Sequence, residues 1–501
     1  MKAGKVWLVG AGPGDPGLFT VKGREALLRA EVVVYDSLVG PGILSLIPPG
    51  AAAIFVGKRA SCHTMPQEQI NRILLEQAQK GLRVVRLKGG DPFLFGRGAE
   101  ELVLLKEHQI PYEIVPGIPS PLAVPAYHGI PVTHRDFSSS LHVVTGHPKA
   151  GKEVSLDFEA LVRVGGTLVF LMGVAALGAI CRGLLEAGME PDMPAALLQQ
   201  GTMAGQKRIL ATVGTLEEEG KRQGVKTPAL IMVGKVCSLA KEFAWYESLP
   251  LSGYKVLLTR PRERISALAA KLREQGAEVL ELPSIRTEAV EEIELLRKVF
   301  GRLRKYQWIV FTSPTGVCIF FEKMREEHCD FRSLGSARIA ALGEGTGKAL
   351  EERGIFADLV PEVYDGEHLA KALAKQKISG TCILLPRAEY GNPELVRILE
   401  ESGAHVEEVV TYRTVYEEQK WIDEKQELES GAIDCVVFTS ASTVRGFAKA
   451  CRGLDFSKVK AACIGKQTAA EAEKQGMQIR VAGKATLDSL AELVLDMKRK
   501  G

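Results

Sequence analysis

A glycine turn that follows an apolar run, within residues 84–97, contains residue types that suit a ligand site. The β-forming residues of 84–87 favour a strand, and Gly89 and Gly90 follow it directly. Adjacent glycines let the main chain turn sharply and let a ligand approach it closely. Asp91 then places a carboxylate beside the turn. Because ligands of open α/β sheets bind beyond the carboxyl ends of the strands, the run predicts the floor of an active site. On its own the run slightly favours an ordinary strand-to-loop turn, so the choice between the two interpretations depends on the rest of the chain.

Three further strands are expected to end on residues that could contact the same ligand. The strands are expected at 5–10, 32–36 and 53–56, and their ends deliver Pro13, Asp36 and Lys58. Since the carboxyl ends of parallel strands lie at the same edge of a sheet, Asp36 and Lys58 would lie near the glycine turn. The loop 10–17 is only weakly similar to a dinucleotide fingerprint, because Pro13 and Pro16 remove two amides that a phosphate would need.

Composition and charge exclude several classes of protein. The chain of 501 residues is too long for one ordinary domain, so we expect about three or four compact units. A net charge of +3 gives no sign of the general basic character that nucleic-acid-binding proteins show. Residues 1–10 lack a signal-peptide pattern, and no run of about 18 apolar residues predicts a membrane span. The nine cysteines contain no Cys-x-x-Cys pair, which favours a cytoplasmic protein with no zinc or disulfide framework.

Strands alternate with helices along the chain, which predicts an α/β architecture. After the first lobe, a second lobe is expected to contain strands at 141–147, 167–173, 195–198 and 229–234. Residues 255–258 begin a new first strand, and this second half repeats itself. Val310-Phe311-Thr312-Ser313 is echoed by Val437-Phe438-Thr439-Ser440, and 342–346 is echoed by 464–468. Two similar lobes that face a cleft explain this pattern better than a solenoid.

A series of short motifs follows in order along residues 1–246. The series comprises Gly10-Ala11-Gly12-Pro13-Gly14-Asp15, Tyr35-Asp36, Gly57-Lys58, Arg86-Leu87-Lys88-Gly89-Gly90-Asp91-Pro92-Phe93, Phe95-Gly96-Arg97-Gly98, Thr133-His134-Arg135, Met172-Gly173, Gln200-Gly201-Thr202 and Thr227-Pro228-Ala229. Together these motifs resemble a uroporphyrinogen-III C-methyltransferase of the tetrapyrrole methylase family. The resemblance implies two α/β lobes with S-adenosylmethionine (SAM) between them, in a homodimer formed through this half. It also implies two methyl transfers to pyrrole carbons of uroporphyrinogen III, which give precorrin-2 for the cobalamin or sirohaem branch.

The resemblance assigns roles to individual residues. Pro13, Gly89, Gly90, Asp91, Leu94, Pro119, Ser120, Met172, Gly201 and Ala229 would line the SAM site. Asp36 would accept a proton and Lys58 would donate one, although a protonated lysine could instead bind a substrate carboxylate. Arg97 and Arg135 would bind the acetate and propionate groups of the substrate, with Glu100 orienting Arg97. Without the motifs, a surface ion pair explains each arginine equally well.

Two positions depart from the family's pattern. Pro119 stands where the family commonly has threonine, which puts one hydrogen bond to SAM or to the backbone in question. Leu171 stands where a tyrosine often precedes the methionine. Neither change removes a group that the resemblance makes catalytic.

The repeated motifs of the second half, together with Val409-Val410-Thr411-Tyr412-Arg413-Thr414, resemble uroporphyrinogen-III synthase over about residues 253–501. The resemblance implies cyclisation of hydroxymethylbilane with inversion of its last ring, without a cofactor. Tyr412 would assist departure of the terminal hydroxyl. Thr312, Ser313, Thr346, Thr439, Ser440 and Thr468 would bind carboxylates. Helix capping is the alternative for these hydroxyls, and for several of them it is the favoured interpretation.

Together the two resemblances imply a two-lobed tetrapyrrole methylase fold followed by a two-lobed parallel-sheet uroporphyrinogen-III synthase fold. The expected boundaries are 1–246 (lobes about 1–138 and 139–246), a linker at 247–253, and 254–501 (lobes about 254–284 plus 415–501, and 285–414). The synthase product is the methyltransferase substrate, which favours a bifunctional enzyme whose partners are small tetrapyrroles rather than nucleic acid or membrane. Two rivals stay open: a methylase of another ring carbon, RNA or protein, and a second half that binds a small molecule without catalysis.

Overall fold

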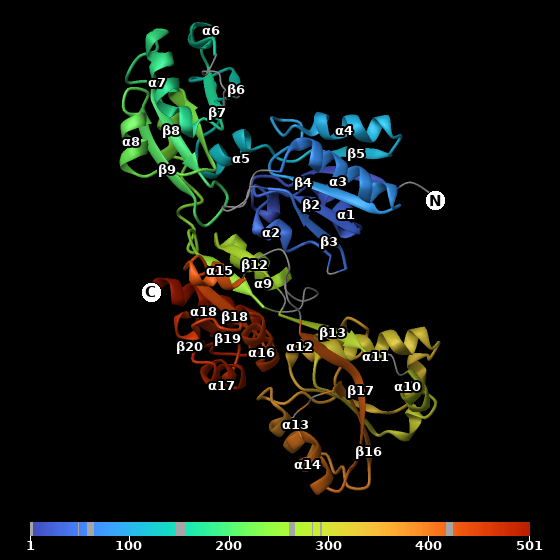
Figure 1. Cartoon of the computed structure of the whole chain (residues 1–501). Helices are drawn as coiled ribbons and strands as arrows, with labels where there is room; N and C mark the ends of the chain where they lie inside the picture. Colours follow the sequence, from blue (N-terminus) through green and yellow to red (C-terminus); the bar gives the residue numbers. More distant parts are fainter. Residues whose placement is uncertain are drawn as a thin grey trace. The chain divides into compact units, whose positions relative to one another are not determined.

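A computed structural model describes most of the chain. The described residues are 4–48, 50–57, 65–146, 156–259, 266–282, 284–290, 293–389, 391, 393–416 and 424–500. The chain divides into two compact units, which are residues 1–282 with 419–439 and 453–501, and residues 283–418 with 440–452. Four five-stranded sheets with helices around them carry these units, which confirms the α/β class (Figure 1).

The first sheet is entirely parallel and places the glycine turn at the end of a central strand. Its order is β3-β2-β4-β1-β5, with β1 Lys5–Gly10, β2 Val32–Tyr35, β3 Ala52–Phe55, β4 Arg83–Lys88 and β5 Tyr112–Val115. Alternate strand residues bury opposite faces: Val32 and Val34 pack with α3 (Gln67–Gln79) and α4 (Gly98–Glu107), whereas Val33 packs with α1 (Val21–Leu28) and α2 (Pro41–Leu44). Thr20 caps the N-terminus of α1, because its Oγ1 accepts from the Gly23 amide at 3.1 Å.

The second sheet is mixed, with order β6-β7-β10-β8-β9. Its strands are β6 Leu141–Thr145, β7 Thr167–Leu171, β8 Pro194–Gln199, β9 Lys207–Thr212 and β10 Ala229–Val233. β6 and β7 are parallel, whereas β10 runs antiparallel to β7 and β8. The helices α6 (Phe158–Val164), α7 (Leu177–Glu186) and α8 (Leu216–Arg222) pack on one face. The sequence pattern does not predict β5 or β9.

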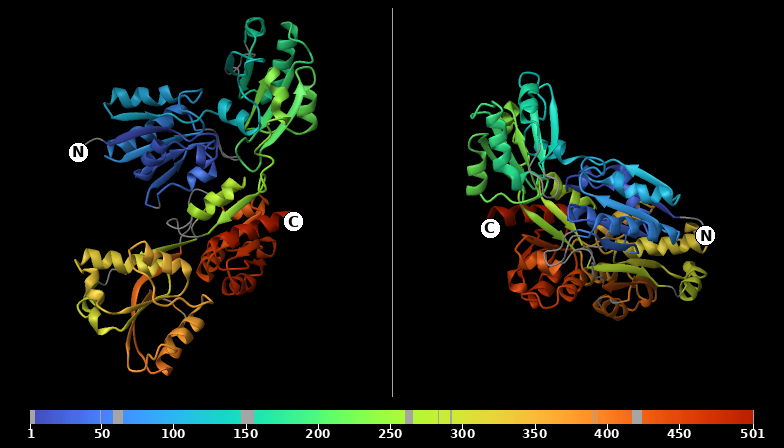
Figure 2. Two further views of the ribbon diagram at one scale, coloured as in Figure 1. Left: turned by 180° about the vertical axis from the view of Figure 1, so that it is seen from behind. Right: turned by 45° about the horizontal axis from the view of Figure 1, so that its top comes forward.

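The second half of the chain contains two more sheets, whose strands interleave along the sequence. One is the parallel sheet β12-β11-β18-β19-β20, with β11 Lys255–Leu258, β12 Glu278–Glu281, β18 Cys435–Phe438, β19 Lys460–Cys463 and β20 Gln478–Val481. The other is β13-β17-β16-β14-β15, with β13 Ile285–Ala289, β14 Trp308–Phe311, β15 Arg338–Ala341, β16 Cys382–Ala388 and β17 His405–Tyr416. The long pair β16 and β17 can be followed from two sides in Figures 1 and 2. Only β13, which the sequence pattern does not predict, runs antiparallel to its neighbour.

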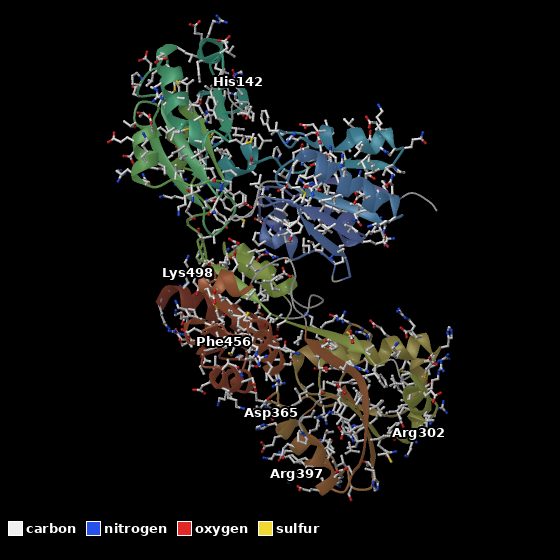
Figure 3. All side chains as sticks on the ribbon, in the orientation of Figure 1. His142, Arg302, Asp365, Arg397, Phe456 and Lys498 are labelled. Atoms are coloured by element: carbon white, nitrogen blue, oxygen red, sulfur yellow. The ribbon has the colours of Figure 1, made fainter. Side chains whose placement is uncertain are left out.

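Exposed ion pairs mark the outer surface of some helices. On α14 (Pro393–Glu401), for example, Arg397 pairs with both Glu394 and Glu401, one turn away in each direction (Figure 3). Such exposed pairs add little stability, so they mark the solvent face rather than a site. Within the described ranges, no helix has the length and apolar character needed to cross a bilayer.

Candidate active sites

The ends of β1 and β4 are joined through their backbones at the glycine turn. The Gly12 amide donates to the Gly90 carbonyl at 3.1 Å, and the Gly90 amide donates to the Gly12 carbonyl at 2.7 Å. Gly90 has a φ of +66°, which residues with side chains rarely adopt. A Cβ on Gly10 would lie 2.5 Å from Gly117. These segments approach so closely that side chains do not fit, and Pro13 follows Gly12 into the same loop.

Asp91 ties the glycine turn to the segment that contains Gly117. Its Oδ1 accepts a hydrogen bond from the Phe93 amide at 2.8 Å, and its Oδ2 accepts one from the Gly117 amide at 3.0 Å. Each carboxylate oxygen keeps a second acceptor position. Asp91 can therefore hold the two segments together and still accept a hydrogen bond from a ligand. Leu94, like Asp91, is half-buried.

Asp36 lies directly after β2, on the strand that neighbours β4. Its Oδ1 accepts from the Leu38 amide at 3.1 Å, and its Oδ2 accepts from the buried Arg86 guanidinium at 3.0 Å. Leu38 packs on Gly89, where an added Cβ would lie 2.6 Å from the Leu38 Cβ. The structure therefore brings Asp36 to the glycine turn with its side chain 22% exposed. Lys58 lies outside the described residues.

Arg97 and Glu100 form an exposed bidentate ion pair at the start of α4. Nε and Nη2 of Arg97 donate to the two oxygens of Glu100 at 2.9 and 2.6 Å. This hydrogen bonding raises the pKa of Arg97 and lowers the pKa of Glu100. Glu100 therefore orients the Arg97 guanidinium, and the ion pair itself is a surface contact. Arg135 is exposed in the segment before β6. Substrate binding by either arginine stays a prediction.

Three predicted SAM-site residues of the second lobe meet at one edge of its sheet. β7 ends just before Met172, β8 ends just before Gly201, and β10 begins at Ala229. Because β10 runs antiparallel to both of its neighbours, these three positions lie at the same edge. Met172, Gln200 and Thr202 have positive φ angles of 55°, 46° and 74°. Such backbone strain, about 1–3 kcal/mol for each residue, clusters at functional sites.

Two hydrogen bonds fix the loop 10–17 beside this edge. The Asp15 amide donates to Thr202 Oγ1 at 3.2 Å, and Tyr127 Oη donates to the Asp15 carboxylate at 2.7 Å. Burial and then the bond to Asp15 raise the pKa of Tyr127, so its hydroxyl stays a donor. Sequence reasoning missed all three residues as members of the site. Asp15 and Thr202 lie within motifs of the family resemblance, which could have pointed to them. Tyr127 lies in no such motif.

Pro119 and Ser120 begin α5 (Ser120–Tyr127) against the glycine turn. A Cβ on Gly90 would lie 3.7 Å from the Ser120 amide nitrogen. Pro119 occupies the N-cap position and makes no side-chain cap hydrogen bond. A threonine hydroxyl at the N-cap would accept a hydrogen bond from an amide of the first turn. The departure at this position therefore leaves the helix without a side-chain cap at the edge of the candidate SAM site.

Tyr412 and Ser313 meet in the second half of the chain, although 99 positions separate them. Tyr412 Oη and Ser313 Oγ lie 2.8 Å apart, and the tyrosine on β17 is only 8% exposed. Ser313 Oγ also accepts from the Gly316 amide at 2.9 Å, at the start of α11 (Pro314–Glu326). The serine is therefore held by the helix end, and it holds the phenol in turn. An oriented phenol is a suitable group for donating a proton to a leaving hydroxyl.

The other predicted hydroxyls of this half serve different local structures. Ser440 forms a capping box with Thr443 at the start of α16 (Ala441–Ala450). Thr346 and Thr468 are buried in the first turns of α12 (Glu344–Glu351) and α17 (Lys466–Lys474), and Thr312 and Thr439 are half-buried at strand ends. Helix capping is confirmed for the two serines at 313 and 440. Carboxylate binding stays a prediction for the whole set.

Arg387 is a buried cation near Tyr412 that was not predicted from the sequence as part of the site. It lies on β16 beside β17, is 7% exposed, and donates to Glu408 at 2.6 Å. An arginine inside an apolar strand was a usable signal, because buried charges are rare unless they are paired. Within the described ranges, no three His, Cys, Asp or Glu side chains gather as metal ligands would.

Comparison with known families gives one match to each half. Residues 5–217 match the family described as Tetrapyrrole (Corrin/Porphyrin) Methylases, and residues 266–492 match the family described as Uroporphyrinogen-III synthase HemD.

Individual relatives are similar to the whole chain or to part of it. A porphyrin biosynthesis protein HemD of Ruminiclostridium josui is 44% identical over 497 residues, which cover 99% of each chain. A uroporphyrinogen-III C-methyltransferase of Bacillus subtilis (strain 168) is 42% identical over 363 residues, 72% of this chain and 74% of the relative. Among solved structures, a Thermus thermophilus uroporphyrin-III C-methyl transferase complexed with S-adenyl homocysteine is 38% identical. The match covers 47% of this chain and 100% of the solved chain, with a TM-score of 0.41.

Proposed function

Since this chain belongs to the family in which a tetrapyrrole methylase is joined to a uroporphyrinogen-III synthase, we propose that it catalyses two consecutive steps. The second half cyclises hydroxymethylbilane to uroporphyrinogen III. The first half then transfers two methyl groups from SAM to that product, which gives precorrin-2. The observation that carries the proposal is the presence of both families in one chain, because one supplies the substrate of the other.

The first half would use its loops to align the reactants. SAM supplies an electrophilic methyl group, and a pyrrole carbon of the substrate forms the new bond as the sulfur–methyl bond breaks. The paired loops of Gly12 and Gly90 present backbone groups to the co-substrate, and Asp91 offers further acceptor positions. Alignment of this kind supplies much of an enzymatic rate gain. Asp36 would then take up the proton that the methylated ring releases, and Arg97 would bind a substrate carboxylate.

The second half would assist loss of a hydroxyl group. The terminal hydroxyl of hydroxymethylbilane leaves as water once it receives a proton, and the methylene carbon of the resulting azafulvene bonds to the last ring. Inversion of that ring breaks its bond to the neighbouring bridge carbon and forms a new bond from that bridge to the ring's other α-carbon, and the proton that the ring loses balances the proton given to the leaving water. Tyr412 is the proposed proton donor, because its buried hydroxyl is fixed by Ser313 at 2.8 Å. The hydroxyls at strand and helix ends would bind the substrate's carboxylates, and no cofactor takes part.

A coupled assay on the full chain tests the proposal. Hydroxymethylbilane and methyl-labelled SAM are supplied together, and the expected product is a type III macrocycle that carries two labelled methyl groups. A type III macrocycle with a methyl group on another carbon would identify the rival methylase. Formation of only the type I macrocycle would show that the second half is a ligand-binding module without synthase activity.

The assembly of the chain is part of the same proposal. The resemblance implies a homodimer formed through the methyltransferase half. Light scattering on the purified full chain is expected to give twice the mass of 54.3 kDa. A monomeric mass at assay concentration would reject the dimer without affecting the proposed reactions.

A further inference from the structure

A group of four charged side chains lies beneath the glycine turn, on the face of the sheet that α3 and α4 cover. Arg86 and Lys88 project from β4, and their side chains are 3% and 8% exposed. Glu101 projects from α4 and is fully buried, while Asp36 lies at the end of β2. The group lies beside apolar residues of this face, among them Leu102 and Leu105 of α4. The proposed chemistry uses only Asp36, so the other three charges need a separate explanation.

The contacts run from α4 to Asp36 in a continuous line. Glu101 Oε1 accepts from Lys88 Nζ at 2.7 Å and from Arg86 Nε at 3.3 Å. The Nη2 atom of Arg86 donates to Asp36 Oδ2 at 3.0 Å, and its Nη1 donates to the Leu87 carbonyl at 2.7 Å. Gln67 of α3 also donates to Glu101 Oε1, at 3.3 Å. Three nitrogens of one planar guanidinium are thus fixed at once, two of them by carboxylates.

This arrangement makes Arg86 a rigid spacer between Glu101 and Asp36. A guanidinium is planar and always charged, so fixing Nε also fixes the direction of Nη2. Two cations and two carboxylates balance in the group, which reduces the cost of burying them. Burial, followed by the charge of Arg86, lowers the pKa of Lys88, and Glu101 opposes that shift. Removal of the Glu101 charge would therefore leave Arg86 and Lys88 with Asp36 as their only carboxylate partner among the described residues.

We propose that Glu101 is a positioning residue for methyl transfer, and that it acts on Asp36 through Arg86. The inference rests on the proposed role of Asp36. Glu101 does not contact the turn that would hold SAM, so its loss should affect the reaction and leave co-substrate binding intact. Anchoring of α4 is a separate function, which Leu102 and Leu105 already serve in the apolar core.

The test compares Glu101→Gln with Glu107→Gln in the full chain. Glu107 is an exposed residue of the same helix and has no part in the site. Glu101→Gln is expected to lower kcat for methylation by on the order of 10- to 100-fold, because small misplacements of reacting groups cost about that much. The affinity for S-adenosylhomocysteine, measured by calorimetry, should stay within about twofold of the parent value. Glu107→Gln should match the parent chain in both measurements. Glu101→Asp, which restores the charge, should recover part of kcat.

Two further variants keep the test decisive. Arg86→Lys retains the cation but cannot bridge both carboxylates, and it should reproduce the loss of kcat with retained S-adenosylhomocysteine binding even if Glu101→Gln does not fold. Asp36→Asn, assayed in parallel, separates the proposed role of Asp36 from the positioning role of Glu101. Parental methylation by Asp36→Asn would reject the proposed role of Asp36 itself. An inactive Asp36→Asn beside Glu101→Gln and Arg86→Lys enzymes of parental kcat would overturn only the positioning role. Equal losses of kcat and ligand affinity would overturn it too, in favour of a purely structural role.

Discussion

The two candidate sites depend on different kinds of contact. In the first half, glycine backbones approach one another closely and buried charges hold one carboxyl group in place. In the second half, a tyrosine and a serine share a hydrogen bond, and the serine also caps a helix. A site made of backbone contacts tolerates almost no added atom, whereas a site made of hydroxyls loses one contact at a time. The first site should therefore fail abruptly under substitution, and the second should fail in steps.

The largest effect is expected from Gly117→Ala. The new Cβ would lie 2.7 Å from Gly10 Cα and closer still to the Gly90 carbonyl oxygen, so the loops must separate. Methylation should fall by more than about 100-fold, because displaced reactants lose their alignment. Synthase activity, measured from the same preparation by the yield of type III macrocycle, should stay within about twofold of the parent value.

Gly50→Ala is the matched control for this substitution. Gly50 belongs to the same lobe, and among the described residues no atom other than those of Gly50 and its chain neighbours lies within 4 Å of the position that its Cβ would take. Both activities of this variant should equal those of the parent chain. Retention of more than half of the methylation rate by Gly117→Ala would contradict the expectation that the first site loses its activity abruptly when an atom is added.

The next effect is expected from Tyr412→Phe in the second half. Loss of the phenol removes the proposed proton donor, and such groups contribute on the order of 100-fold. The type III macrocycle should give way to the type I product of uncatalysed closure, which chromatography separates. Tyr306→Phe is the control, because Tyr306 is also buried and its hydroxyl donates to Glu407 at 2.7 Å, outside the proposed site. The control should cost about 1 kcal/mol of stability and leave the isomer ratio unchanged. Unchanged type III yield from Tyr412→Phe would remove the tyrosine from the mechanism.

In both sites the sequence predicts local features better than contacts between distant elements. Runs of β-forming residues that end at Gly10, Asp36 and Lys88 predict three of the strand ends, because strand and turn signals are local. The pairing of Arg86 with Glu101 could not be predicted, since it depends on which face of the sheet α4 covers. The contact between Ser313 and Tyr412 depends on distant strands in the same way. Antiparallel β13 was missed for a similar reason, as its pairing with β17 is set by tertiary structure.

A smaller effect separates the two serines that cap helices. Ser313→Ala and Ser440→Ala should each lower the free energy of unfolding by about 1 kcal/mol, the usual cost of losing an N-cap, as measured by urea denaturation. Ser313→Ala should also slow the synthase several-fold, because Tyr412 loses its hydrogen-bond partner. Ser440→Ala should leave the synthase rate unchanged if the residue only caps its helix. A larger loss of rate from Ser440→Ala than from Ser313→Ala would instead indicate that Ser440 binds substrate carboxylates.

The smallest expected effect is a pH dependence of the unfolding free energy that comes from a buried histidine of the first half. His128 in the first half is fully buried, with Nδ1 lying 3.5 Å from Glu247, and burial lowers its pKa from the ordinary 6.5. The folded imidazole therefore stays neutral while the unfolded one takes up a proton below that value. The stability that His128 contributes is present above pH 6.5 and is lost as the pH falls. From pH 6.5 to 6.0 the loss should stay below about 0.7 kcal/mol, since one group cannot exceed about 1.4 kcal/mol per pH unit. His128→Gln, which cannot take up this proton, should show a flatter dependence of unfolding free energy on pH over that range. An equally steep dependence in His128→Gln would assign the acid sensitivity to other groups.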